Sequence, residues 1–188
     1  ATAILTITIN GANESGPSLT ITDNNGNATT GQESVAENAS VTGKTFTVSA
    51  AGGLQKITVA GTDVTLAALN NASSSNVAIT TSEGVLTITG YNSGTGVVTY
   101  SYDPSGTHKD HSSGAVTDAI AIVVTDNASQ TTSGTLTLLI TDSTPVVVAD
   151  SGSVTEDASP NTVSGNVYTN DTIGADGEAV AGAVTAHS

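Results

Sequence analysis

The sequence predicts an all-β fold, an antiparallel β-sandwich, and three observations support this prediction. Apolar and polar residues alternate with a period of two in many short runs, Gly/Asn/Asp turns separate these runs, and Val, Ile, Leu and Thr dominate them. A sandwich buries alternate residues of each strand and leaves the others in water. Many short strands without a helical period therefore favour two packed sheets.

The runs that predict strands follow one another along the chain. In the first run, 3–9, the residues Leu5, Ile7 and Ile9 share one face. The stretch 66–71 has the pattern of a single short helical turn. The other predicted strands are 18–22, 44–49, 55–59, 84–89, 97–102, 118–125 and 135–141.

The composition limits what the core is made of. The chain has no Cys, Met or Trp and only one Phe, so aliphatic side chains and four tyrosines must fill the interior. Tyr100 and Tyr102 share a strand face with Val98, which predicts a core position for both rather than a sugar-stacking surface. Without cysteine the fold owes nothing to disulfides.

The charge excludes two classes of partner and favours a third. A formal net charge of -14 repels phosphate backbones and anionic lipid surfaces. We therefore expect neither nucleic-acid binding nor direct membrane insertion. Cations are the natural small partners of such a surface.

An internal echo predicts tandem repeats. The motif 34–40 recurs at 153–159, about 120 residues further on, which is the size of one sandwich module. We divide the chain into the last strand and linker of a preceding repeat (1–16), a complete repeat (17–143) and the start of the next (144–188). That last piece is expected to contain a strand at 145–149. The expected partners are neighbouring repeats of the same chain. Apart from these, we expect the protein to be a monomer.

Oxygen-bearing side chains gather at strand ends and linkers, which predicts calcium sites. Ca²⁺ takes six to eight hard oxygens, and linkers supply them from carboxylates, amides and carbonyls. At Asp23 and Asn25 the alternative is a turn closed by its own side chains. Elsewhere the alternative is a solvated acidic linker. The predicted ligands are Asp23, Asn25, Asp142, Asp150, Glu156, Asp157, Asp171 and Asp176.

No arrangement of residues predicts catalysis. The Gly-x-Ser-x-Gly elbow and the lysine-containing phosphate loop are both missing from the sequence. Residues 108–111, His-Lys-Asp-His, offer donors for zinc, but flanking Ser and Gly favour a flexible hairpin tip. We therefore expect a protein that is not an enzyme. A secreted hydrolase with paired carboxylates stays open as the less favoured alternative.

Several segments resemble the repeat domains of giant type I-secreted (RTX) bacterial adhesins, which are similar in style to VCBS and cadherin-like repeats. The resemblance is carried by residues 84–91, 98–102, 110–118, 123–126 and 134–145. It implies an immunoglobulin-like β-sandwich that acts as a calcium-rigidified extender at the bacterial cell surface, in cell adhesion or biofilm formation.

The family pattern Asp-Ala-Asp-Gly-Asp falls on Asp126–Gln130, where only Asp126 keeps its carboxylate. The resemblance therefore adds Asp126 to the predicted calcium ligands. A module that binds a glycan or another cell surface is the main alternative to an extender.

Overall fold

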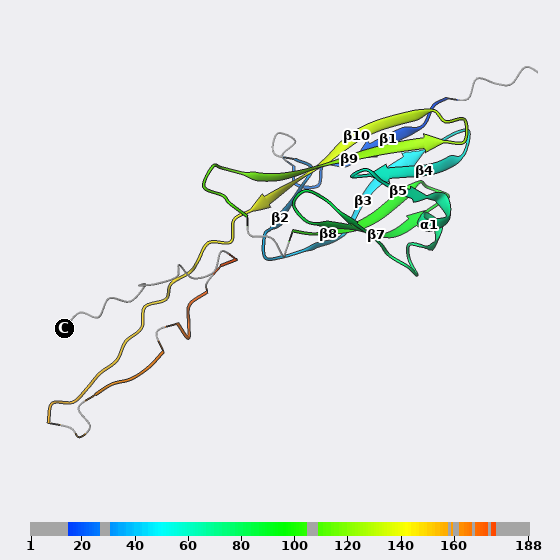
Figure 1. Ribbon diagram of the computed structural model, residues 1–188. Helices are drawn as coiled ribbons and strands as arrows, with labels where there is room; N and C mark the ends of the chain where they lie inside the picture. The colour runs from blue at the N-terminus through cyan, green and yellow to red at the C-terminus, as the bar shows by residue number, and fades with distance from the viewer. Residues whose placement is uncertain are drawn as a thin grey trace, which may run out of the picture.

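The structure, a computed structural model, describes residues 15–26, 31–104, 109–157, 159, 162–166, 168–172 and 174–175. Within this part of the chain, ten strands and one short helix lie between residues 18 and 141 (Figure 1). They are β1 (Ser18–Ile21), β2 (Glu33–Ala36), β3 (Val41–Ser49), β4 (Leu54–Val59), β5 (Thr62–Thr65), α1 (Leu66–Asn71), β6 (Val77–Thr80), β7 (Val85–Asn92), β8 (Val97–Asp103), β9 (Val116–Asp126) and β10 (Thr131–Thr141).

The strands form two five-stranded sheets packed face to face. One sheet has the order β1-β3-β8-β7-β6 and the other β2-β10-β9-β4-β5. All neighbours are antiparallel except β2, which pairs with β10 in parallel. The predicted all-β, immunoglobulin-like sandwich is confirmed.

The pair β9–β10 is the longest ladder of the sandwich. Its register runs from the pair Thr131–Thr125 to the pair Ile140–Val116. Along β10 the side chains of Leu136, Leu138 and Ile140 are buried, while the residues between them face outward. This alternation matches the predicted period of two, and it builds the centre of the core.

The chain enters and leaves the sandwich at opposite ends of this ladder. Gly16, just before β1, lies beside the β9–β10 turn, since a Cβ built on it would lie 3.2 Å from Oε1 of Gln130. We call this the hairpin end. The other is the exit end, where β10 finishes at Thr141 (Figure 1).

The helix α1 begins where the sequence provides a cap. The Thr65 hydroxyl accepts a hydrogen bond from the backbone N–H of Ala68 at 3.2 Å, which satisfies one of the unpaired amides of the first turn. Leu69 is then buried against the core. The predicted helical turn at 66–71 is confirmed.

Three short strands were not predicted from the sequence, namely β2, β5 and β6. Each has four residues, like the predicted β1, and so short a run is easily missed among neighbouring polar residues. The predicted strand at 3–9 lies outside the described residues. Over 145–149 the structure shows only an isolated bridge between Val146 and Thr172, because this stretch has no continuous neighbour to pair with.

After β10 the chain runs away from the sandwich and folds back beside itself (Figure 1). We call the described part of residues 143–175 the tail. The large apolar side chains that it exposes are Val146, Val147, Val148, Val154, Val163 and Tyr168. Because exposed apolar side chains contribute little stability, the tail depends on a few hydrogen bonds.

Two buried tyrosines differ in how their hydroxyl groups are satisfied. Tyr100 and Tyr102 are fully buried, which confirms their predicted core positions. The Tyr102 hydroxyl donates to Oδ2 of Asp118 at 2.7 Å. The Tyr100 hydroxyl is buried and makes no hydrogen bond within the described residues. Burial raises the pKa of both phenols far above the ordinary value.

These contacts predict opposite effects of the same substitution. Tyr102→Phe removes a donor from a buried carboxylate and is expected to lower the free energy of unfolding by about 1–3 kcal/mol. Tyr100→Phe removes an unpaired buried hydroxyl, and the free energy should be unchanged or rise by up to about 1 kcal/mol. Urea unfolding of both variants measures the difference. An equal loss in the two would contradict the hydrogen-bond assignment.

Candidate functional site

Six polar or charged residues are buried within the part of the chain that the structure describes. Glu33, Glu37, Lys109 and Asp118 lie toward the exit end, and Thr125 and Asp126 lie at the hairpin end. Buried charges are costly unless they are paired and hydrogen-bonded. Each of these charges therefore needs fixed partners, which hold neighbouring segments of the chain in place.

Glu37 directly follows β2 and ties the exit end to the segment that leaves it. Its side chain is 2% exposed. Its Oε1 accepts two hydrogen bonds from Ser143, one from the backbone N–H at 2.9 Å and one from the hydroxyl at 3.0 Å. Its Oε2 lies 3.7 Å from Nε2 of His111. Glu37 was not among the predicted site residues.

The surroundings of Glu37 favour its charged form. Burial works to raise the pKa of this carboxyl group, but the two hydrogen bonds from Ser143, the His111 imidazole and the Asp142 side chain together hold it below its ordinary value. Hydrogen bonds to a carboxylate are the strong class, being shorter and stronger than neutral ones. Glu37 is therefore a charged acceptor at neutral pH.

Lys109, in the described part of the loop before β9, is anchored by buried contacts. The Lys109 side chain is 1% exposed, and its Nζ donates to the backbone carbonyl and to Oε2 of Glu83, the latter at 3.1 Å. Beside it, Asp118 accepts from the Ser82 hydroxyl at 2.7 Å. The prediction of a flexible hairpin tip is wrong at Lys109, because a buried ammonium group needs fixed partners. His108 lies outside the described residues.

Asp126 closes the β9–β10 turn at the hairpin end. It is fully buried, and its Oδ1 accepts from the backbone N–H groups of Ala128 at 2.9 Å and Gln130 at 2.7 Å. Its Oδ2 is buried without a hydrogen-bond partner in the part of the chain that the structure describes. The Asn127 amide follows it and donates to the carbonyl of Gly52 at 3.3 Å.

The first predicted calcium loop forms a turn closed by its own side chain. Oδ1 of Asp23 accepts from the backbone N–H groups of Asn25 at 3.2 Å and Gly26 at 3.0 Å. The Asn25 amide nitrogen donates to the Ser34 hydroxyl at 3.0 Å. This is the geometry of an Asx turn, the alternative weighed at these two residues.

The predicted ligands after β10 do not come together in any group of three among the described residues. Asp142 is exposed beside Glu37, and Asp150, Glu156 and Asp157 are exposed as well. Oδ1 of Asp171 accepts from the backbone N–H of Val148 at 2.7 Å, which holds the two runs of the tail together. Asp176 lies outside the described residues.

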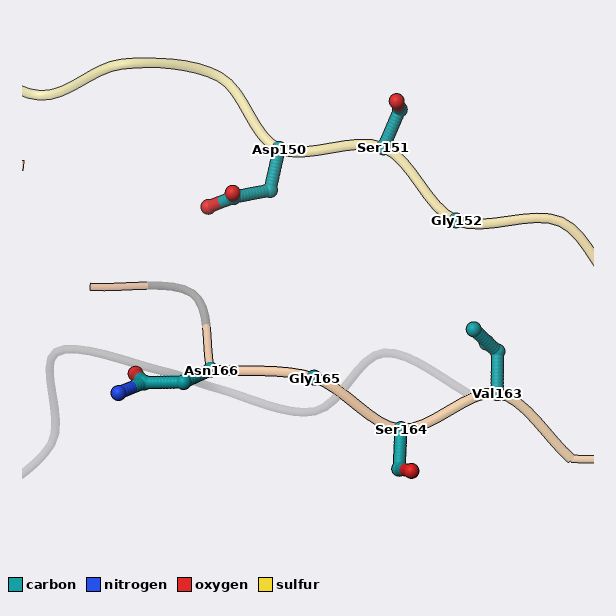
Figure 2. A pocket seen from close by; sticks show the side chains of 7 residues that line it. All are labelled: Asp150, Ser151, Gly152, Val163, Ser164, Gly165 and Asn166. Carbon is teal, nitrogen blue, oxygen red and sulfur yellow. The ribbon is translucent and has the colours of Figure 1, made fainter. Parts of the chain in front are cut away.

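A cavity of about 430 Å³ separates the two runs of the tail. Figure 2 shows the side chains of Asp150 and Val163 pointing into the space between the runs, whereas Ser151 and Ser164 point away from it. One carboxylate and one amide, that of Asn166, are the strongest donors in its lining. They fall short of the six oxygens that calcium takes.

We tested whether the described residues fit a calcium ion. No group of three or more His, Cys, Asp or Glu side chains among them has the geometry of a metal site. At the exit end, Oε1 of the buried Glu37 already accepts from Ser143, and Oε2 of Glu37 lies 3.7 Å from Nε2 of His111. At the hairpin end, Oδ2 of Asp126 has no hydrogen-bond partner among the described residues, and Asn127 and Gln130 of the same turn have amide side chains. Of the two ends, the hairpin end is where calcium could gain a carboxylate oxygen that has no hydrogen-bond partner among the described residues, but it too supplies fewer side-chain oxygens than the six that calcium takes.

No family model, curated protein or solved structure matches this chain. Within the described residues, none of the helices reaches the length and hydrophobicity that crossing a membrane requires. The functional argument therefore depends on the geometry of the two ends.

One sequence signal could have identified Glu37 before the structure. The repeated motif aligns Glu37 with Glu156, and only Glu156 was selected because it lies in an acidic linker. The structure gives the opposite ranking, since Glu37 is buried and partnered while Glu156 is exposed. Lys109 and Asp118 gave no such signal, because their burial depends on contacts with the distant turn at Ser82 and Glu83.

The Asp126 turn predicts a local loss of stability. Asp126→Ala removes a buried carboxylate that accepts hydrogen bonds from two backbone N–H groups of the turn, so the free energy of unfolding should fall by about 1–3 kcal/mol. Asp150→Ala, at an exposed carboxylate of the tail, serves as the control and should stay within about 0.5 kcal/mol of the parent chain. Urea unfolding followed by circular dichroism measures both. Equal values for the two variants would argue against Asp126 as the residue that closes the turn.

Proposed function

We propose that this chain is a structural spacer, an extender repeat of a large bacterial surface adhesin that supports cell adhesion or biofilm formation. The role is mechanical and not catalytic: the module separates its neighbours by a fixed distance. Its partners are the neighbouring repeats of the same chain, and its location is extracellular.

The observation that carries the proposal is the placement of the two chain connections. The chain enters beside Gln130 and leaves after Thr141, at the two ends of the eleven-residue strand β10. At about 3.4 Å per residue, this strand separates the connections by roughly 35 Å. Modules linked in this way extend end to end instead of folding back on one another.

Calcium is the proposed stiffening ion, and the hairpin end is the proposed place. Asp126 would supply Oδ2, which has no hydrogen-bond partner among the described residues, and the same turn carries the amide side chains of Asn127 and Gln130. A bound divalent cation would neutralise buried charge and join the turn to the chain that enters beside it. Extracellular calcium modules bind at about 10⁻⁴–10⁻³ M.

A glycan-binding module is the second candidate, and one cavity favours it. A space of about 340 Å³ opens at the hairpin end between Leu54, Leu66, Tyr91 and Thr95, which all line it. Its lining carries hydroxyl groups and one half-buried aromatic ring, the chemistry that contacts a neutral sugar. We favour the spacer because the same end also receives the incoming chain at Gly16.

The spacer proposal predicts the shape of a tandem protein. Two copies of the chain joined end to end should have a maximum dimension about twice that of one copy, because each module keeps its connections at opposite ends. Small-angle X-ray scattering of the single and double chains gives both values. If the double chain is as compact as two modules packed side by side, the spacer role is wrong.

The calcium proposal predicts an ion-specific gain in stability. If the site binds at about 10⁻⁴–10⁻³ M, 10 mM calcium adds about 1.4–2.7 kcal/mol by mass action. The melting temperature should then rise by roughly 5–15 °C relative to EDTA, and magnesium should not reproduce the shift.

Asp126→Ala should abolish that shift, whereas Asp150→Ala should keep it. Differential scanning calorimetry in EDTA, calcium and magnesium provides the comparison. A calcium response that survives in Asp126→Ala would place the ion elsewhere, and no response in the parent chain would remove calcium from the proposal.

A further inference from the structure

We propose that Glu37 is a clamp that fixes the direction in which the chain leaves the sandwich, and that it does so without a metal ion. Its carboxylate receives both the backbone N–H and the hydroxyl of Ser143, two residues after β10 ends. The clamp goes beyond the spacer role because it assigns the rigidity of the exit to one side chain. It is independent of the calcium proposed at the opposite end.

Glu37 already accepts two hydrogen bonds from the outgoing chain at Oε1, so the exit can be held without a cation. Oε1 holds two donors from Ser143, at 2.9 and 3.0 Å, and Oε2 lies 3.7 Å from Nε2 of His111. Calcium selects oxygen ligands, and an imidazole nitrogen on this side disfavours it. An ion at this position would have to displace the Ser143 hydrogen bonds.

The clamp acts over a short and well-supported piece of backbone. The parallel ladder of β2 and β10 ends at the pair Ala36–Thr141, and the backbone N–H of Glu37 then donates to the carbonyl of Thr141 at 3.0 Å. Acceptor and donor therefore sit one and two residues past the last paired position. With so little free chain between them, holding Ser143 fixes the first residues of the linker.

Ser143 passes the constraint on to the tail. Its hydroxyl donates to Glu37 and also accepts from the backbone N–H of Ala175 at 2.8 Å. A serine hydroxyl has one donor and two acceptor positions, so both bonds form at once. Gly174 approaches the Ser143 carbonyl so closely that a Cβ would overlap it. One residue thus joins the sandwich to both runs of the tail.

The amide of Ser143 reports directly on the clamp. Hydrogen exchange of this amide in the 188-residue chain should be slowed about 10- to 100-fold relative to Glu37→Ala, because the lost bond is to a buried charged group. The protection should be the same in EDTA and in calcium. Glu37→Gln keeps one oxygen acceptor, so its rate of Ser143 amide exchange should lie between the rates of the parent chain and of Glu37→Ala.

A matched control comes from the second copy of the motif. Glu156 occupies the place in 153–159 that Glu37 occupies in 34–40, but it is exposed. Glu156→Ala should therefore leave the exchange of the Ser143 amide unchanged. Ser143→Ala removes the hydroxyl, and with it the bond to Glu37 and the bond from Ala175, but keeps the backbone N–H that Glu37 accepts, so it tests the hydroxyl part of the clamp with little risk to folding.

A distance measurement provides the second readout. The chain has no cysteine, so the exposed positions Ala119 and Ser151 accept spin labels as Cys variants without background. The distance distribution between the sandwich and the tail should be equally narrow in EDTA and calcium, and broader in both Glu37→Ala and Ser143→Ala. If the parent distribution narrows only when calcium is added, or if Glu37→Ala matches Glu156→Ala, the metal-free clamp is wrong.

Discussion

The ladder between β9 and β10 sets the length of the module, and it positions the Asp126 turn at one end and the exit of the chain at the other. It runs without a break from Thr131 to Ile140. Its turn buries Asp126 at one end, and its other end brings Val116 beside Ile140, next to the exit. Because hydrogen-bonded strands resist extension along their length, the separation of the two ends is a property of backbone pairing. The side chains at each end then decide how firmly a neighbour is held.

Much of the sandwich could be predicted from the sequence because the long strands alternate clearly. Seven predicted runs coincide with strands to within one residue at an end or lie inside them, and the cap at Thr65 places α1 where a helical turn was expected. The parallel strand β2 could not be predicted, since four residues, two of them Glu33 and Ser34, show no apolar pattern. Its position comes from tertiary contacts, including the ion pair of Glu33 with Lys44 at 2.9 Å. Local patterns do not record such pairings.

The candidate site was predicted less well, and the reason is physical. Sequence reasoning selects carboxylates by their spacing, which led to Asp23, Glu156 and Asp157. Burial decides whether a carboxylate is held or solvated, and burial depends on residues far away in the chain. Glu37 is separated from Ser143 by 106 positions, and Asp118 from Ser82 by 36. Asp126 was found because the resemblance pointed to its turn, not because its burial could be read from the sequence.

The two ends of the module solve the same problem by different chemistry. At the exit, an anionic side chain is neutralised by donors from its own chain, so the hydrogen bonds form whenever the module folds. At the hairpin end, Asp126 keeps an unpaired oxygen, which gives an ion something to bind. If the proposed spacer role and the proposed calcium site are correct, one junction has a stiffness that is set at folding, and the stiffness of the other follows the surrounding calcium. Long arrays would then bend mainly on the side of each module where the chain enters.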